Sequence, residues 1–504
     1  MAGLHQRRLL PVIMIEVRYK IHDEYSIEFK QRFLVRQGIK DNRFEVNTWL
    51  FIPNSLDITP QTYGQDLFYR DVKSNVRLIT PVYTLYDLGR ADAAPFRYLK
   101  QAFTTLAGNP DKDNTAEFVY QIKMVSVIIK GALRDHASAM IREVDTGRIR
   151  EAGQEFIACT VKVLEQFRKM KEIINVPAVS EDRKAHFLFG DEAVSQLVIV
   201  YALKILSFLR DQGSCPEEEQ ALRSFVTSEY HYKRKMGYSV LDTYDREKNK
   251  ELVYRYGLLK KYIESDLFVT LDQKKDGIAL EQIYYSIAAG VAMIFATVVA
   301  FIFQRRFGMF SIPLFLALVI SYMLKDRIKD LMRYYFAYKR KGKYFDHKST
   351  VRFKDKAIGW IKEGMDFISP AKVPAIVMDL RNCSNRMMSE YSLLDEKIIL
   401  YRKLVHIDSR EMEENNLYTV DGINDIFRLH INRLTQKMDN PLVPLMKLDE
   451  TTGDLLTIEA PKIYNLHIIM QVRSEDHSDF RAFKVVASRD GIKKIETPDL
   501  PGRE

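Results

Sequence analysis

Two runs of uncharged, mostly apolar residues dominate the hydrophobic pattern, at 283–303 and 307–324. At ~1.5 Å per helical residue the first is about 31 Å long and the second about 27 Å, close to the ~30 Å hydrocarbon core of a bilayer. Because only residues 304–306 separate them, the two helices must be antiparallel neighbours. The pattern predicts a transmembrane helical hairpin. A hairpin buried in a soluble core and a re-entrant hairpin that does not fully cross are the alternatives.

A stripe of small residues marks one face of the first run: Ala288, Ala292, Ala296 and Ala300. Small side chains at every fourth position let a second helix approach closely. We expect this stripe to pack inside the hairpin, with an oligomer interface as the alternative. Neither run contains Asp, Glu, Lys, Arg or His, so the sequence does not indicate an intramembrane proton or ion relay.

A third apolar stretch, 193–209, is interrupted by polar residues and closely flanked by charged ones. A helix buried in a soluble core explains these features better than a third span does. The polar and charged residues in question are Gln196, Lys204, Ser207, Asp191, Glu192 and Arg210.

Before residue 88 the apolar positions alternate with a period of two, which is typical of half-buried strands. Four such segments, 13–21, 25–35, 43–52 and 72–80, predict one four-stranded antiparallel sheet. Residues 54–70 are expected to form an ordered loop.

The period then becomes helical, with apolar residues at every third or fourth position. One-sided helices of this length should bundle, and the sheet can pack against that bundle. The predicted helices are 116–143, 148–176, 181–210 and 216–267, the last broken near Gly237 and Gly257.

Beyond the hairpin, the second apolar helix is expected to continue to about residue 340, and the pattern becomes mixed. Further helices are predicted at 356–368, 373–387 and 424–438, whereas 397–406 fits a strand or a helix. Alternation returns at 464–472, 480–488 and 492–497 and predicts a three-stranded meander. Because a hairpin returns the chain to the side it left, we expect this meander to lie beside the N-terminal strands.

Together these elements predict an α+β membrane protein with five parts. They are an N-terminal antiparallel β domain (1–88), a cytosolic helical bundle (89–275), the transmembrane hairpin (276–325), a basic juxtamembrane and mixed helical region (326–450) and a C-terminal β-meander (451–504).

The charge distribution adds an orientation. Twelve basic residues and four acids lie between 325 and 356, so this segment holds +8 of the formal +9. Only Arg305 and Arg306 lie at the hairpin tip, and the positive-inside bias therefore puts both long flanks and both termini in the cytoplasm. Residues 9–15 are too short an apolar run for a cleavable signal peptide. Eight residues are expected to contact anionic headgroups: Lys325, Arg327, Lys329, Arg333, Lys339, Arg340, Lys341 and Lys343.

Candidate chemistry changes this picture little. The sequence has no P-loop, no G-x-G-x-x-G after a strand, no H-E-x-x-H and no G-x-S-x-G, so no catalytic residue, cofactor or metal is predicted. The clusters His22-Asp23-Glu24 and Glu475-Asp476-His477 fall in predicted turns, where solvated polar residues are common. The three cysteines, Cys159, Cys215 and Cys383, are expected to be reduced thiols.

The leading hypothesis is a membrane-anchored cytoplasmic scaffold, assembly or sensor protein without a recognisable catalytic site. Its expected partners are a bilayer with anionic headgroups and either protein partners or further copies of the chain, and nucleic acid is not favoured. The alternatives are a membrane-associated enzyme or effector with an unrecognised site in its cytosolic part, and an oligomeric pore subunit.

Overall fold

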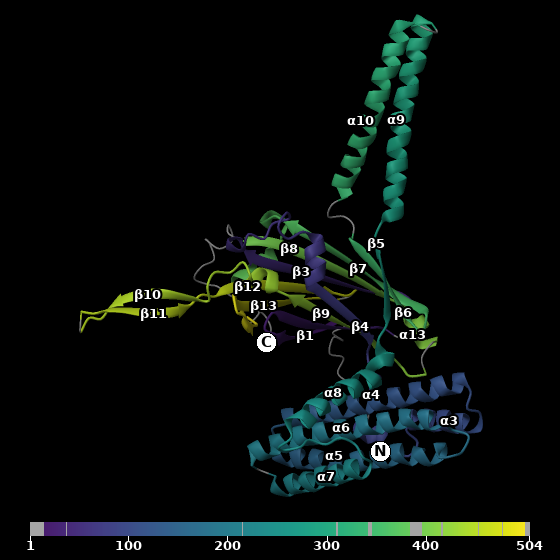
Figure 1. The fold of residues 1–504 in the computed structure, drawn as a ribbon, viewed down its shortest axis with the longest axis vertical. Helices are drawn as coiled ribbons and strands as arrows, with labels where there is room; N and C mark the ends of the chain where they lie inside the picture. Colours follow the sequence, from purple (N-terminus) through teal and green to yellow (C-terminus); the bar gives the residue numbers. More distant parts are fainter. Residues whose placement is uncertain are drawn as a thin grey trace, which may run out of the picture. The chain divides into compact units, whose positions relative to one another are not determined.

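The computed structural model describes residues 15–36, 38–213, 215–308, 311–340, 345–383, 396–414, 417–451, 453–475 and 477–498. Within them the protein is α+β, with antiparallel sheets and long helices (Figure 1). The chain divides into two compact units, each assembled from separate stretches of sequence. The β unit comprises Met1–Val76, Thr270–Asn415 and Gly422–Glu504, and the helical unit comprises Arg77–Val269 and Asn416–Asp421.

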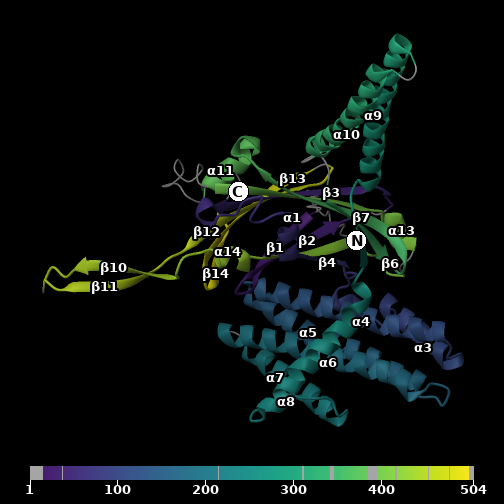
Figure 2. The same cartoon turned by 45° about the horizontal axis from the view of Figure 1, so that its top comes forward.

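The larger sheet of the β unit has eight strands in the order β14-β13-β12-β3-β8-β7-β6-β5 (Figure 2). Strand β3, from near the N-terminus, lies inside this sheet and pairs antiparallel with both β8 and β12. The strands are β3 (Asn42–Pro53), β5 (Thr270–Lys275), β6 (His347–Phe353), β7 (Lys356–Ile368), β8 (Glu396–Ile407), β12 (Tyr464–Arg473), β13 (Ser478–Ser488) and β14 (Gly491–Glu496).

A second sheet of four strands, in the order β1-β2-β9-β4, packs against the first. Their shared core joins Phe29 of β2 and Phe427 of β9 to Ile468 of β12 and Phe483 of β13, all nearly inaccessible to solvent. The strands are β1 (Ile15–Asp23), β2 (Ser26–Leu34), β4 (Val72–Leu78) and β9 (Gly422–His430).

This arrangement corrects the predicted N-terminal sheet. β1, β2 and β4 share a sheet, but β9 from near the C-terminus lies between β2 and β4, and β3 belongs to the larger sheet. The alternation of apolar residues indicates that a strand has one buried face and does not say which strand lies beside it. The expected association of the two chain ends is confirmed, because β12 pairs with β3 and continues into the meander of β13 and β14.

Two segments predicted as helices are strands. Residues 356–368 form β7, and 424–430, the first part of the predicted helix 424–438, belong to β9, while 397–406 is β8. Each lies inside a sheet between two neighbouring strands, and β9 is buried on both faces over its first half. A strand buried on both faces loses its alternation, so its apolar residues can imitate helical spacing.

The shorter elements complete the β unit. Helix α11 covers the outer face of the larger sheet, where Val377 and Leu380 pack with Trp49 and Phe51 of β3. It occupies the first part of the predicted helix 373–387, and residues 384–387 lie outside the described part. The short elements are η1 (Asn54–Leu56), α1 (Gln65–Asp71), η3 (Pro370–Lys372), α11 (Ala375–Cys383), α13 (Ser409–Glu414) and α14 (Asn432–Thr435).

The helical unit is a bundle whose helices begin at identifiable caps. Asp111, Asp145 and Asp245 each accept a backbone N–H at the start of a long helix, as N-cap aspartates do. The predicted break near Gly237 is present, whereas Gly257 lies inside a continuous helix. The helices are α2 (Leu85–Leu88), α3 (Ala94–Gly108), α4 (Lys112–Arg142), α5 (Thr146–Ile174), α6 (Glu181–Gln212), α7 (Pro216–Lys235), α8 (Arg246–Glu264) and η2 (Ser265–Leu267).

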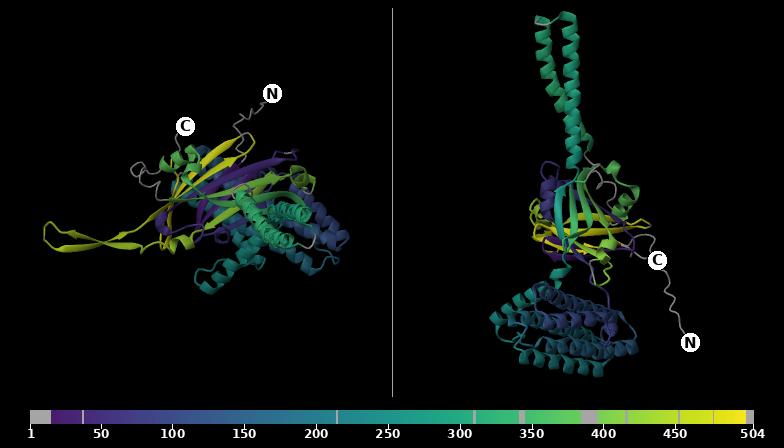
Figure 3. Two further views of the ribbon diagram at one scale, coloured as in Figure 1. Left: turned by 90° about the horizontal axis from the view of Figure 1, so that it is seen from above. Right: turned by 90° about the vertical axis from the view of Figure 1, so that its right-hand side faces the viewer.

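The sequence of the β unit also contains a helical hairpin and a separate two-stranded ribbon. Helices α9 (Ile278–Phe307) and α10 (Ile312–Arg340) lie side by side, as the right-hand view of Figure 3 shows. Strands β10 (Leu442–Leu448) and β11 (Leu455–Pro461) form a two-stranded ribbon of their own, which we call the arm. Helix α9 continues to Phe307 and α10 begins at Ile312, so the predicted linker 304–306 is part of α9.

Candidate functional site

The inner face of the α9–α10 hairpin is built from small residues. Ala288 and Ala292 of α9 are buried, as are Ala317 and Ser321 of α10. The Ser321 hydroxyl lies 3.4 Å from the carbonyl oxygen of Ala296, so the two helices approach closely. Of the predicted stripe, Ala296 and Ala300 are partly buried.

The outer faces of the same helices are apolar and exposed. Of the 18-residue window that makes α9 long and apolar enough to cross a membrane, 11% is buried. Exposed side chains therefore surround the hairpin on its outward sides. They include Ile283, Ile287, Val291, Ile294, Val298, Phe301 and Ile302 of α9, and Phe315, Leu316, Val319, Ile320 and Met323 of α10.

Charged residues begin on α10 beside the middle of α9. The Ser321–Ala296 contact fixes the register of the two helices. The stacking of Arg333 on the ring of Tyr285, 5.1 Å from its centroid, agrees with that register. The basic half of α10 therefore lies alongside the first half of the apolar helix.

The predicted headgroup-contact residues are only partly placed. Lys325 lies 4.0 Å from the centroid of the Tyr322 ring, and Lys329 forms an ion pair with Asp326 at 3.4 Å. Arg327 is exposed on the same helix. The side chains of Lys339 and Arg340 and all of Lys341 and Lys343 lie outside the described part.

The arm is a second exposed apolar surface. Leu445 of β10 pairs directly with Ile458 of β11, and both side chains are more than half exposed. On the opposite face, Met446 is 72% exposed and Leu448 pairs with Leu455. An isolated two-stranded ribbon is marginally stable in water, and this one carries apolar side chains on both faces.

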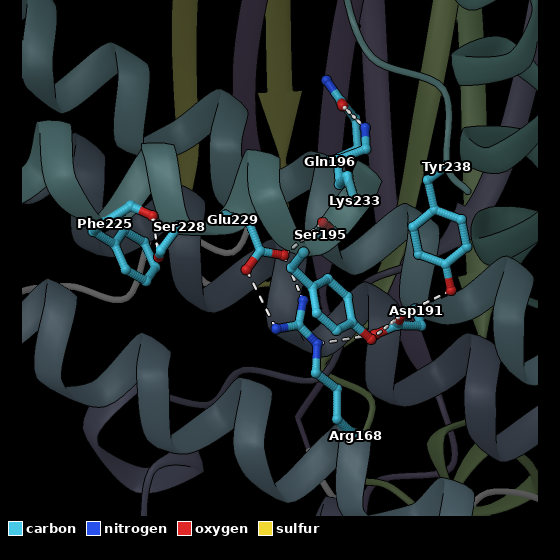
Figure 4. A network of polar contacts seen from close by, with 10 residues as sticks. Arg168, Asp191, Ser195, Gln196, Phe225, Ser228, Glu229, Lys233 and Tyr238 are labelled. Carbon is cyan, nitrogen blue, oxygen red and sulfur yellow. Dashed lines mark hydrogen bonds and ion pairs between the residues drawn. The ribbon is translucent and has the colours of Figure 1, made fainter. Parts of the chain in front are cut away.

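A network of buried charges joins α5, α6 and α7 in the helical unit (Figure 4). The Arg168 guanidinium donates to Glu229 and, at 3.2 Å, to Asp191. Tyr232 and Tyr238 each donate to Asp191 at 2.8 Å. Burial, together with the Asp191 charge, raises the pKa of both tyrosines. A positive charge thus lies between two acids, Asp191 and Glu229.

A smaller network lies between the two sheets of the β unit. Lys403, almost fully buried, pairs with Asp425 and, at 3.1 Å, with Glu363. Burial alone would lower the pKa of Lys403, but the two carboxylates outweigh it and raise it. Ser74 donates to Asp425 at 2.5 Å, and Tyr401 donates to Glu363. In both networks each buried charge has a partner of opposite sign. Such pairing is typical of buried charges that join elements of a fold.

The described residues of the two metal-like clusters form no ligand set. Asp23 accepts the backbone N–H of Tyr25 at 2.9 Å, an ordinary turn contact, and Asp476 lies outside the described part. Among the described residues no group of three or more His, Cys, Asp or Glu side chains could hold a metal ion. A hollow of about 10 Å³ beside Arg36 and Asn42 has room for about one water molecule.

Sequence reasoning missed the arm and both networks. The arm has a local signature, because its two apolar strands flank a tight turn in which Gly453 adopts a left-handed φ of 74°. The networks have none, since the partners of Arg168 lie 23 and 61 residues away along the chain.

Comparisons with known proteins do not assign this chain. No family model matches it, and no curated protein matches it. Among solved structures, it aligns with a chain of a de novo designed 16-helix transmembrane nanopore, over 51% of this chain and 84% of that one. The two are 11% identical with a TM-score of 0.21, which is too low to indicate a shared fold.

Proposed function

We propose that this protein is a cytoplasmic scaffold or assembly protein, anchored in a membrane by the α9–α10 hairpin. The observation that carries the proposal is the exposure of α9, a helix long and apolar enough to cross a membrane. Contiguous apolar surfaces of this size on soluble proteins mark interfaces with lipid or with other proteins. Lipid fits the exposed sides of α9 and of 312–324 on α10, which are apolar.

Charge supports the choice of lipid and gives the orientation. The basic residues that follow the apolar part of α10 would lie where anionic headgroups attract them, at about 1 kcal/mol per residue near the surface. By the positive-inside bias, the same excess supports a cytoplasmic location for both units.

The arm supports the scaffolding role. Its tip carries Asp449, Glu450 and Asp454, which an anionic membrane surface repels. Because both of its faces are apolar, a partner must cover it on two sides. We assign it to a protein partner with an apolar groove and basic groups near the tip.

Membrane fractionation tests the anchor. The full chain should stay in the membrane pellet through high-salt and alkaline washes and leave it only with detergent. Protease added to the cytoplasmic face of closed vesicles should digest both units. Release by salt alone would show a peripheral protein held by its basic residues, and a fully soluble chain would show that protein covers the hairpin.

The arm is tested by comparing Met446→Ser/Ile458→Ser with the control Leu241→Ser/Val253→Ser, which removes exposed apolar residues from the helical unit. A photo-crosslinking residue at position 446 should join the arm to its partner in mild detergent. Only the arm variant should lose the proteins that co-purify with the wild type. A crosslinked dimer of the chain would identify a second copy as the partner. Full retention of all partners by the arm variant would overturn the assignment, and a protein that purifies alone would favour the alternative, a membrane-associated enzyme.

A further inference from the structure

The apolar part of the hairpin is bounded by a charged layer at each end. Arg305 and Arg306 occupy the last turn of α9, at the tip. On α10 the uncharged stretch is 312–324, after which Lys325 and Asp326 follow at once. The distance between these two layers determines the hydrocarbon thickness of the bilayer that fits the hairpin.

The register of the two helices gives that distance. With Ser321 beside Ala296, Lys325 lies level with Ala292. Arg305 comes thirteen residues after Ala292 on the same helix. At ~1.5 Å per residue the two charged layers are about 20 Å apart along the axis, and any tilt reduces the thickness they span.

A hydrocarbon core of ~30 Å exceeds this length by about 10 Å. Lysine and arginine side chains can reach several ångströms along a helix toward the headgroups, and this recovers part of the difference. Asp326 is too short to do so. Its ion pair with Lys329, at 3.4 Å, would have to enter the hydrocarbon if the hairpin crossed a bilayer of ordinary thickness.

We propose that the hairpin is a short span that fits a bilayer with a thin hydrocarbon core. Arg305 and Arg306 lie at the far headgroups, and the layer at Lys325 and Asp326 lies at the near ones. The first turns of α9, beside the basic half of α10, then lie at the headgroup level rather than in the hydrocarbon. This inference rests on the proposed membrane anchor.

Trypsin trapped inside vesicles tests the depth, because Arg305 and Arg306 are themselves trypsin sites. The full chain is reconstituted with its units outside, in vesicles with a threefold excess of phosphatidylcholine over phosphatidylglycerol, and external trypsin is inhibited. Acyl chains of 14, 18 or 22 carbons set the thickness. Cleavage at the tip, measured by mass spectrometry, should be at least about tenfold greater in the thinnest vesicles than in the thickest.

A variant with a longer apolar segment sharpens the test. Replacing Lys325, Asp326 and Arg327 by leucine extends the uncharged part of α10 to Ile328, by about 6 Å, and should raise cleavage in 18-carbon vesicles above that of the wild type. Lys250→Leu removes one exposed positive charge from α8, the same net change, and should behave as the wild type.

The possible results distinguish failure of the short-span proposal from failure of the proposed membrane anchor. Equal cleavage at every thickness would overturn the short span, because the full apolar length of α9 would then set the depth. Membrane-bound protein with no cleavage at any thickness would also overturn it, since the hairpin would not cross. Failure to associate with any vesicle would instead refute the proposed anchor.

Discussion

Helices α6 and α9 are both long and apolar enough to cross a membrane, yet they lie in opposite surroundings. In α6, 56% of the apolar window is buried inside the helical unit, against 11% in α9. Length and apolar content therefore do not distinguish a buried core helix from an exposed apolar helix. The structure shows which further property does.

That property is the presence of charges with partners. Asp191 and Glu192 of α6 are almost fully buried, Asp191 against Arg168 and Glu192 against Arg255 at 2.5 Å. Helix α9 has no charged residue between 283 and 303. A helix with buried acids needs neighbouring helices to neutralise them, whereas a helix without charges can be covered by lipid alone.

The largest predicted effect comes from removing the charge that holds α6 in its bundle. Arg168→Met leaves Asp191 and Glu229 buried without their cation and should destabilise the helical unit by about 3–5 kcal/mol. Urea unfolding in detergent, followed by circular dichroism, measures this. Lys171→Met, exposed on the same helix, should change stability by less than about 0.5 kcal/mol.

Equal effects of these two substitutions would show that the network does not hold α6. If Arg168→Met does not fold, the double variant with Glu229→Leu should recover part of the loss, because it removes one of the two unpaired acids.

The same substitution on each helix should have opposite consequences. Val298 of α9 and Leu203 of α6 are both exposed apolar residues, and Val298 lies near the middle of the proposed short span. Val298→Asp should cost about 2.5–3.5 kcal/mol of insertion free energy if lipid surrounds that position, whereas Leu203→Asp should leave insertion unchanged. The fraction of chain in the membrane pellet measures both. A neutral Val298→Asp would mean that water or protein covers α9.

Gly190 of α6 and Gly290 of α9 differ in the same way, and their substitution should change stability by a smaller amount. A Cβ at Gly190 of α6 would collide with the Ile122 side chain, while the space around Gly290 of α9 is open to 4 Å. Gly190→Ala should destabilise by about 1–3 kcal/mol through overpacking. Gly290→Ala should stabilise its helix by up to about 1 kcal/mol. Thermal unfolding in detergent distinguishes them, and a shift of the same sign for both would contradict the difference in packing.

Alkaline pH should weaken the α6 network through its two tyrosines. The pKa values of Tyr232 and Tyr238 are raised in the folded state by burial and by Asp191, so their contribution is complete below pH 10. Above pH 10 the unfolded chain loses these protons first, and stability should fall by up to about 1.4 kcal/mol per tyrosine for each pH unit. The Tyr232→Phe/Tyr238→Phe variant should show a flatter decline. Identical profiles would show that other groups dominate the alkaline transition.

The sequence was sufficient for elements with one buried face. The long helices α4 to α6 and the meander of β12 to β14 lie close to their predicted positions because their apolar periodicity reflects that burial. It was insufficient for β9, where Phe427, Ile431, Leu434 and Met438 follow helical spacing although the chain is a strand until His430.

The hairpin itself was predicted from its sequence, but its effective length was not. The uncharged run 307–324 includes the end of α9 and the turn, so the helical part that remains on α10 is 312–324. Which charge lies level with which apolar residue depends on the position of the turn. Spacing along one helix does not contain that information.

The pairing of β5 with β6 has a consequence for how this chain can be cut and rejoined. Lys275 lies opposite His347, and the N–H of Asp276 donates to the carbonyl of Asp346 at 3.1 Å. The chain thus leaves the sheet and re-enters it at neighbouring positions, so residues 277–345 form a loop excursion between two adjacent ends. Joining Asp276 to Asp346 through an Asn-Gly turn would give an ordinary β-hairpin. The hairpin is in this sense an insertion, and a chain without it should still pair β5 with β6.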